Sequence, residues 1–276
     1  MSSNILHEAS ALLLDSLAVD LPQSLILAGP VGVGLTGAAD YILKDLKVTR
    51  HIVLPEKNEK IDLESGVISV DSIRRLYELT KTIETGKRVI VIDYAERMAS
   101  QAQNAFLKLL EEPGVNTHFI LLTHEPSRLL PTIQSRAQRV DIRPISKTQS
   151  VELLTTLGVT DTKRQAQLLF VAMGLPAELT RLSKDESYFE KRAAIIRDAR
   201  QLLQGSTYER LRVAEQYKDN RQAALTVLLD AMNMLRSSLS TDPKQGTLTK
   251  MRALLRAYER IEANGHIRLQ LSVAVL

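Results

Sequence analysis

Short, almost wholly apolar runs recur through the first half of the chain, and each is followed by a segment with apolar residues three and four apart. The runs predict strands buried on both faces, and the intervening segments predict amphipathic helices. The predicted strands are SLILA (24–28), HIVLP (51–55), RVIVID (88–93), HFILLT (118–123) and QRVDIRP (138–144). The predicted helices cover 3–20, 35–46, a segment from Asp71 towards Gly86, and a segment from Ser100 to Pro113.

Two of these helices carry recognisable end signals. Asp71 can cap the third predicted helix, and Gly86 can stop it. Ser100 and Gln103 match a capping box at the start of the fourth, a pattern in which the two side chains satisfy backbone N–H groups of the first turn.

Apolar strands that alternate with amphipathic helices predict an α/β fold with a parallel sheet covered on both faces. In such sheets, ligands bind beyond the carboxyl ends of the strands. Three features lie at those ends: a glycine-rich loop after the first strand, Asp93 at the end of the third, and Thr123 at the end of the fourth. The sequence therefore predicts one site that combines them.

Only helical patterns follow Pro144. The predicted helices cover 146–157, 161–173, 176–184, 188–204, 207–239 and 246–264. We expect domain boundaries near 144 and 205, which give an α/β domain over 1–144 and helical domains over 145–205 and 206–276.

Composition narrows the kinds of site that the chain can hold. It has no cysteine, which excludes disulfides and Cys-ligated zinc, and its five histidines lack metal-ligand spacing. We therefore expect no metal site. No secretory signal is visible, and no apolar run reaches the roughly 20 residues of a membrane span. We expect a cytoplasmic protein with no membrane partner.

The net charge of +4 comes from an excess of basic residues within 201–276. No basic run is interleaved with aromatic residues, as stacking on nucleic-acid bases would require. A solvated helical surface is the preferred interpretation of this excess.

The glycine-rich loop GPVGVGLT (29–36) matches a Walker A phosphate loop except at one position. Gly29, Gly34 and Thr36 match the pattern, with Gly32 between them, but Leu35 replaces the lysine. The backbone could still cradle a phosphate and Thr36 could still reach Mg²⁺, whereas Leu35 neutralises no charge. A strand–helix connector without a ligand is the alternative interpretation.

The segment VIVIDYAER (89–97) resembles a Walker B strand, in which Asp93 would hold Mg²⁺ through water. ATPases of the AAA+ class usually place a general-base glutamate next, but Tyr94 stands here. Glu96 is expected to be a surface carboxylate that points elsewhere. Because both the cation and the base are missing, we expect no ATP hydrolysis and no required cofactor. Weak binding of ATP or ADP with Mg²⁺ stays open.

Four collinear segments resemble the clamp-loader subunits of bacterial DNA polymerase III, which are AAA+ proteins, and among these the delta-prime type most closely. The resemblance implies a P-loop AAA+ domain, a helical lid and a helical collar that assembles with other subunits. The four segments are ISVDSIRRLYEL (68–79), QAQNAFLKLLEEPG (101–114), FILLTHEPSRLLPTIQSRAQ (119–138) and YERIEANGHIRLQLSVAVL (258–276).

The resemblance also implies a function and partners. The family's S-R-C motif, here Ser135, Arg136 and Ala137, supplies an arginine to the ATP of a neighbouring subunit. Ala177 aligns with the family's sensor-2 arginine, although nearby Arg181 leaves that alignment open. These features imply a non-hydrolysing, stator-like subunit that works with the gamma or tau and delta subunits, the sliding clamp and primer–template DNA.

Two alternatives stay open. One is an ATP-hydrolysing AAA+ motor, such as a gamma-type loader or a branch-migration helicase. The other is an interaction protein on a decayed AAA+ scaffold that acts outside replication. The sequence also departs from the family, because the four-cysteine zinc module of many relatives is absent and the C-terminal helical region is short.

Overall fold

The structure is a computed structural model, and it describes residues 5–63, 65–82, 86–241 and 246–275. It divides into two compact units, Met1–Ser183 and Lys184–Leu276. The three-domain division with boundaries near 144 and 205 stays a prediction. Among the described residues, no helix combines the length and the apolar character that a membrane crossing requires.

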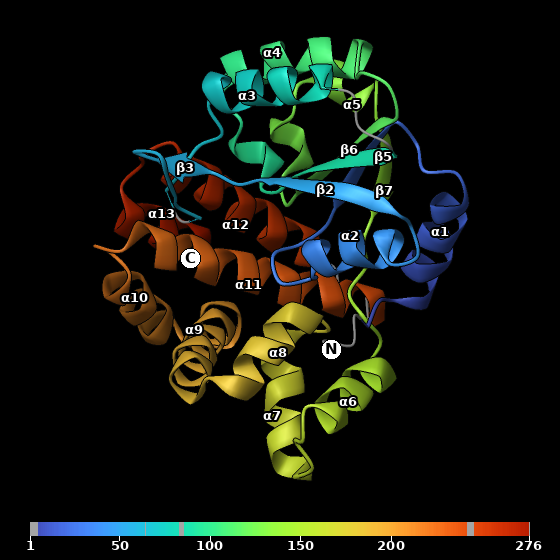
Figure 1. The fold of residues 1–276 in the computed structure, drawn as a ribbon. Coiled ribbons are helices and arrows are strands. Elements are labelled where there is room, and N and C mark those ends of the chain that lie inside the picture. The colour runs from blue at the N-terminus through green and yellow to red at the C-terminus, as the bar shows by residue number, and fades with distance from the viewer. Residues whose placement is uncertain (1–4, 64, 83–85, 242–245, 276) are drawn as a thin grey trace. The chain divides into compact units, whose positions relative to one another are not determined.

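A five-stranded parallel sheet lies at the centre of the first unit, in the order β2-β5-β6-β1-β7 (Figure 1). Every apolar run that predicts a strand forms one, which confirms the expected α/β fold. The strands are β1 (Ser24–Ala28), β2 (Val48–Val53), β5 (Lys87–Ile92), β6 (Thr117–Thr123) and β7 (Gln138–Asp141).

Strand β1 lies at the point where the strand order reverses. Its last residue, Ala28, pairs with Thr123 of β6 on one side and with Asp141 of β7 on the other. A crevice for a ligand is expected beyond the carboxyl end of a strand in this position. The glycine-rich loop starts at Gly29, and thus begins at the switch point.

Helices cover both faces of the sheet (Figure 1). Alternate residues of β1 divide between two buried clusters: Leu25 and Leu27 pack with α1 and α2, and Ile26 packs with α3 and α4. Every residue of β1 is buried, which explains why this strand is apolar from Leu25 to Ala28. The helices are α1 (Glu8–Val19), α2 (Leu35–Leu43), α3 (Val70–Lys81) and α4 (Ser100–Glu111).

The predicted end signals of α3 and α4 were wrong. Helix α3 is capped by Ser69, whose hydroxyl accepts a hydrogen bond from the N–H of Ser72, and it ends at Lys81 rather than at Gly86. Helix α4 follows Ala99 without a side-chain cap. Gln103 is therefore not part of a capping box, and its side chain has other partners.

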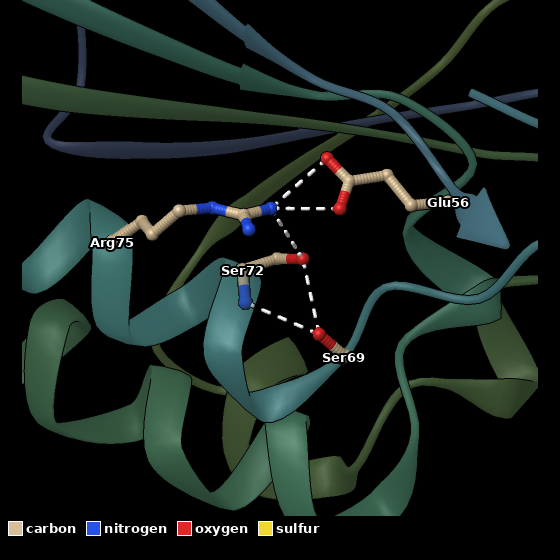
Figure 2. Close-up of polar contacts among 4 residues, drawn as sticks. All are labelled: Glu56, Ser69, Ser72 and Arg75. Atoms are coloured by element: carbon tan, nitrogen blue, oxygen red, sulfur yellow. Dashed lines mark hydrogen bonds and ion pairs between the residues drawn. The ribbon is translucent and has the colours of Figure 1, made fainter. Parts of the chain in front are cut away.

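A short hairpin, β3 (Glu56–Lys57) and β4 (Lys60–Ile61), was not predicted. Figure 2 shows how it is tied to α3: Arg75 Nη2 lies 2.7 and 2.9 Å from the two carboxylate oxygens of Glu56 and also donates to Ser72 Oγ. The Ser72 hydroxyl in turn lies 3.2 Å from the cap hydroxyl of Ser69. The helix start and the hairpin are thus joined by one polar network.

Apart from β7, the elements of the described chain after β6 are helices. The first unit continues through η2 (Pro126–Arg128), α5 (Pro131–Gln134), α6 (Lys147–Thr156), α7 (Thr162–Ala172) and α8 (Pro176–Lys184). The second contains α9 (Glu186–Gln204), α10 (Thr207–Gln216), α11 (Arg221–Thr241), α12 (Thr247–Glu262) and α13 (Ile267–Val275). Most of 207–239 is helical, as predicted, but the turn between α10 and α11 was not predicted.

Candidate nucleotide site and Ser-Arg segment

The loop after β1 has a backbone conformation that requires glycine. Gly32 and Gly34 have φ values of +87° and +86°, where any other L-residue is strained. A Cβ at Gly29 would lie 2.9 Å from the carbonyl oxygen of Ile142, so that position also requires glycine. The predicted glycines are therefore fixed by backbone geometry.

Leu35, at the position of the missing lysine, packs into the core. Its side chain is only 3% exposed and belongs to the buried cluster that contains Val33 and, from β1, Leu25 and Leu27. The position therefore contributes apolar burial instead of a cation directed at a ligand.

The start of α8 packs directly on the loop. The backbone N–H groups of Ala177 and Glu178 donate hydrogen bonds of 3.0 and 3.3 Å to the carbonyl oxygen of Gly32. A Cβ at Gly32 would lie 3.0 Å from Glu178 Cβ, and one at Gly34 would lie 4.0 Å from Ala177 Cβ. Ala177, the residue aligned with the family's sensor-2 arginine, thus contacts the loop through its backbone N–H, and its side chain carries no charge.

The structure brings Thr36 and Asp93 together, as the sequence indicates. Thr36 Oγ1 donates a 3.4 Å hydrogen bond to Asp93 Oδ2, and Asp93 Oδ1 accepts from the N–H of Tyr94. Burial raises the pKa of Asp93 above its ordinary value, with a partial offset from the Tyr94 N–H, His124 and Thr36. The hydroxyl and the carboxylate of this pair are oxygen donors, the ligand type that Mg²⁺ prefers.

Tyr94, which replaces the expected glutamate, remains protonated at neutral pH. Burial and the neighbouring Asp93 carboxylate raise the pKa of its phenol above the ordinary value of 10.0. Its backbone is left-handed at φ 53°, and its ring lies edge-on to His124 with centroids 5.8 Å apart. A protonated phenol cannot accept a proton from water, so Tyr94 is not a general base.

His124 and Glu96 join this site, and the sequence did not indicate either one. His124 Nδ1 lies 2.8 Å from the carbonyl oxygen of Gly29, and its backbone N–H donates to Glu96 Oε2 over 3.3 Å. Glu96 was expected to be a surface carboxylate; it is half-buried, and its contact is with His124 rather than with Asp93. Thr123 contributes its backbone oxygen to the N–H of Gly29, while its hydroxyl accepts from Glu125.

Arg136 and Ser135 lie on a different segment, just after α5. Arg136 is 41% exposed at its side chain; Nη2 lies 2.9 Å from Glu111 Oε1 and Nη1 donates to the carbonyl oxygen of Thr132. The hydroxyl of Ser135 also donates to Thr132. Both residues are exposed, and their side chains bond to Thr132 and Glu111 rather than to the glycine-rich loop.

Gln103 fixes the segment that carries Arg136. Its Nε2 donates to the carbonyl oxygens of Met98 and Arg128, and its Oε1 accepts a 2.7 Å hydrogen bond from the N–H of Leu130. The residue is only 5% exposed. An amide on the otherwise apolar face of α4 was the signal for this role, since a buried polar group requires partners.

The sheet, the glycine-rich loop at its switch point and the helices that follow define the AAA+ class of fold. A point variant of RuvB from Thermotoga maritima superposes with a TM-score of 0.53 at 14% identity, covering 98% of this chain and 90% of that one. A second RuvB variant gives a TM-score of 0.51 at 15% identity, over 96% of this chain and 87% of that one.

Sequence comparison identifies more specific relatives among proteins of this fold. Residues 39–146 match the family model described as DNA polymerase III, delta subunit. The DNA polymerase III subunit delta' of Bacillus subtilis is 35% identical over 121 residues, 44% of this chain and 36% of its own length. That of Pseudomonas aeruginosa is 30% identical over 206 residues, 64% of this chain and 60% of its own length. The expected resemblance to clamp-loader subunits is therefore confirmed.

The resemblance extends to archaeal proteins. A replication factor C small subunit of Aeropyrum pernix is 32% identical over 132 residues, 47% of this chain and 40% of its own length. Across these three curated relatives, the chain spans between 36% and 60% of their length.

Proposed function

We propose that the chain is a non-hydrolysing, delta-prime-like subunit of a bacterial clamp loader, which completes the ATP site of a neighbouring subunit with Arg136. The observation that carries this proposal is the contrast between two places on the molecule. The chain's own loop lacks the cation and the base and is covered by α8, whereas the guanidinium of Arg136 is exposed on a well-anchored segment.

The residues of the loop do not fit ATP hydrolysis. Leu35 is buried and uncharged, so it supplies no cation to a phosphate. Tyr94 is protonated, so it supplies no base. The start of α8 brings Ala177, and no cation, to the loop. Thr36 and Asp93 retain the arrangement suited to hydrated Mg²⁺, so weak nucleotide binding is compatible with this proposal but not needed for it. No cofactor is required for the proposed role.

Arg136 has the chemistry for a role in trans. A guanidinium is always charged, and its planar set of five donors suits phosphate oxygens. An arginine supplied by a neighbour can raise the rate of phosphoryl transfer by about 10³–10⁵. Since two of its donors are used by Glu111 and Thr132, the others can reach a ligand.

The proposed partners follow from the delta-prime-like role. They are the gamma or tau and delta subunits, the sliding clamp and primer–template DNA. Any DNA contact would be with backbone phosphates and would carry no base specificity.

The test of the proposal is ATP turnover in a complex with the gamma and delta subunits of the same organism. Arg136→Ala is expected to assemble normally and to lower turnover. Arg139→Ala is the matched control, because Arg139 lies three residues on, is 44% exposed and is paired with Asp141. An unchanged rate in the Arg136→Ala complex would overturn the proposal.

An ATP-hydrolysing motor is the second candidate, and the position of Glu96 is the observation in its favour. This half-buried carboxylate accepts a hydrogen bond from the N–H of His124, which follows β6, and would have to replace the absent base. This candidate predicts steady-state turnover by the pure chain that Asp93→Ala abolishes. An interaction role outside replication predicts copurification without clamp or polymerase subunits.

A further inference from the structure

Glu111 is the last residue of α4, and its carboxylate contacts the guanidinium of Arg136. Oε1 lies 2.9 Å from Nη2, and the two side chains are 53% and 41% exposed. Nη1 of the same guanidinium donates to the carbonyl oxygen of Thr132 over 3.2 Å. The charged end of Arg136 is therefore held from two sides.

The backbone beneath Arg136 is anchored separately. Ile133 of α5 is fully buried, and Gln134 Nε2 donates to the carbonyl oxygens of Pro126 and Leu129. Gln103 fixes Leu130 at the start of α5. Because these contacts do not involve Glu111, its loss would release the side chain of Arg136 and leave the backbone in place.

We propose that Glu111 is a positioning residue, which orders the guanidinium of Arg136 for contact with a phosphate of the neighbouring subunit's ATP. This inference rests on the proposed function and adds a residue to it. An arginine side chain has large rotamer freedom, and holding it before the ligand arrives removes that ordering cost from the reaction. Glu111 binds Nη2 of the guanidinium and Thr132 binds Nη1. The guanidinium has five N–H donors, so others are available for a phosphate.

A purely structural role for this ion pair makes a different prediction. Pairs as exposed as Glu111 and Arg136 contribute little to folding stability. A structural account therefore expects Glu111→Ala to change neither the melting temperature nor the turnover of the complex. The positioning account expects an unchanged melting temperature together with a lower kcat.

The experiment measures kcat and KM for ATP in the complex with gamma and delta subunits. Glu111→Ala is expected to lower kcat by roughly two- to fivefold with KM little changed, because an ion pair this exposed orders a side chain only weakly. Glu111→Gln keeps a hydrogen-bond acceptor and should restore part of the loss. Glu112→Ala is the matched control, since Glu112 is the adjacent exposed carboxylate.

A double variant separates positioning from indirect effects. In the Arg136→Ala background, Glu111→Ala should cause no further loss, because the side chain that it positions is gone. A further loss there, or a wild-type kcat for Glu111→Ala beside a lowered one for Arg136→Ala, would overturn the inference and leave the proposed function intact. An unchanged rate for Arg136→Ala would instead overturn both.

Discussion

The backbone N–H of Ala177 donates a 3.0 Å hydrogen bond to the carbonyl oxygen of Gly32, joining the start of α8 to the glycine-rich loop. The N–H of Glu178 donates to the same oxygen. In a working phosphate loop, backbone N–H groups and a helix N-terminus face the phosphates. Here the amino end of a second helix packs on the loop with an alanine and no cation.

This contact predicts that nucleotide does not stabilise the isolated chain. A ligand that binds only the folded state raises stability by about 2.7 kcal/mol at one hundred times its Kd. We expect no change in melting temperature with ATP-Mg²⁺ or ADP-Mg²⁺ at about 5 mM, a concentration that would reveal a Kd near 50 μM. A rise of several degrees would show that the loop binds nucleotide in spite of α8.

Restoring the lysine is expected to harm the fold without restoring binding. Leu35 is only 3% exposed, so Leu35→Lys removes a buried side chain whose burial contributes about 1.5–3 kcal/mol. Leu35→Met, which conserves volume, should cost under about 1.5 kcal/mol. Chemical denaturation measures the free energy of unfolding, and titration calorimetry measures binding. Tight ATP binding by a stably folded Leu35→Lys variant would contradict this account of the loop.

Gln103 is expected to matter for both stability and turnover. Gln103→Met leaves the N–H of Leu130 without its side-chain partner, at a cost of about 1–3 kcal/mol, and loosens the segment that carries Arg136. The free energy of unfolding and turnover in the assembled complex check the two effects. Ser100→Ala is the control, because α4 has no side-chain cap, and it should stay within about 0.5 kcal/mol of wild type. Equal effects of the two substitutions would show that the Gln103 network is unimportant.

The buried carboxyl of Asp93 predicts that the melting temperatures of wild type and Asp93→Asn differ by an amount that depends on pH. Burial raises its pKa in the folded state above 3.8, so the folded chain binds more protons than the unfolded chain just above that pH and loses stability as pH rises. Asp93→Asn does not titrate and can still accept from the N–H of Tyr94. The melting temperature of the variant should match wild type near pH 3 and exceed it at pH 7. The opposite trend would mean that the hydrogen bonds of Asp93 outweigh its burial.

Much of the first unit follows from sequence pattern. The segment SLILA is apolar from Leu25 to Ala28 because both faces of β1 are covered. Each of the five predicted strand segments overlaps one strand of the five-stranded sheet. The turn between α10 and α11 was missed because Tyr217 and its neighbours include neither glycine nor proline. The β3–β4 hairpin was missed because its strands are only two residues each and largely polar.

The sequence predicted the site residues that a local backbone conformation requires. It did not predict the residues that join the site only through tertiary contacts. Gly32 and Gly34 were expected in the loop, and both have positive φ. Thr36 lies at the start of the helix after β1 and Asp93 directly follows β5, and the sheet topology brings these two positions together. The contact between His124 and Gly29 joins residues 95 positions apart, and no local pattern announces it. Glu111 was likewise invisible, since one of two adjacent glutamates at a helix end carries no sign of its partner.

ATP turnover by the complex with gamma and delta subunits tests the central claim most directly, measured beside turnover by the isolated chain. The account predicts no turnover by the isolated chain, a substantial rate in the wild-type complex, a lower rate with Arg136→Ala and a wild-type rate with Arg139→Ala. Turnover by the isolated chain, or an undiminished rate in a fully assembled Arg136→Ala complex, would contradict it.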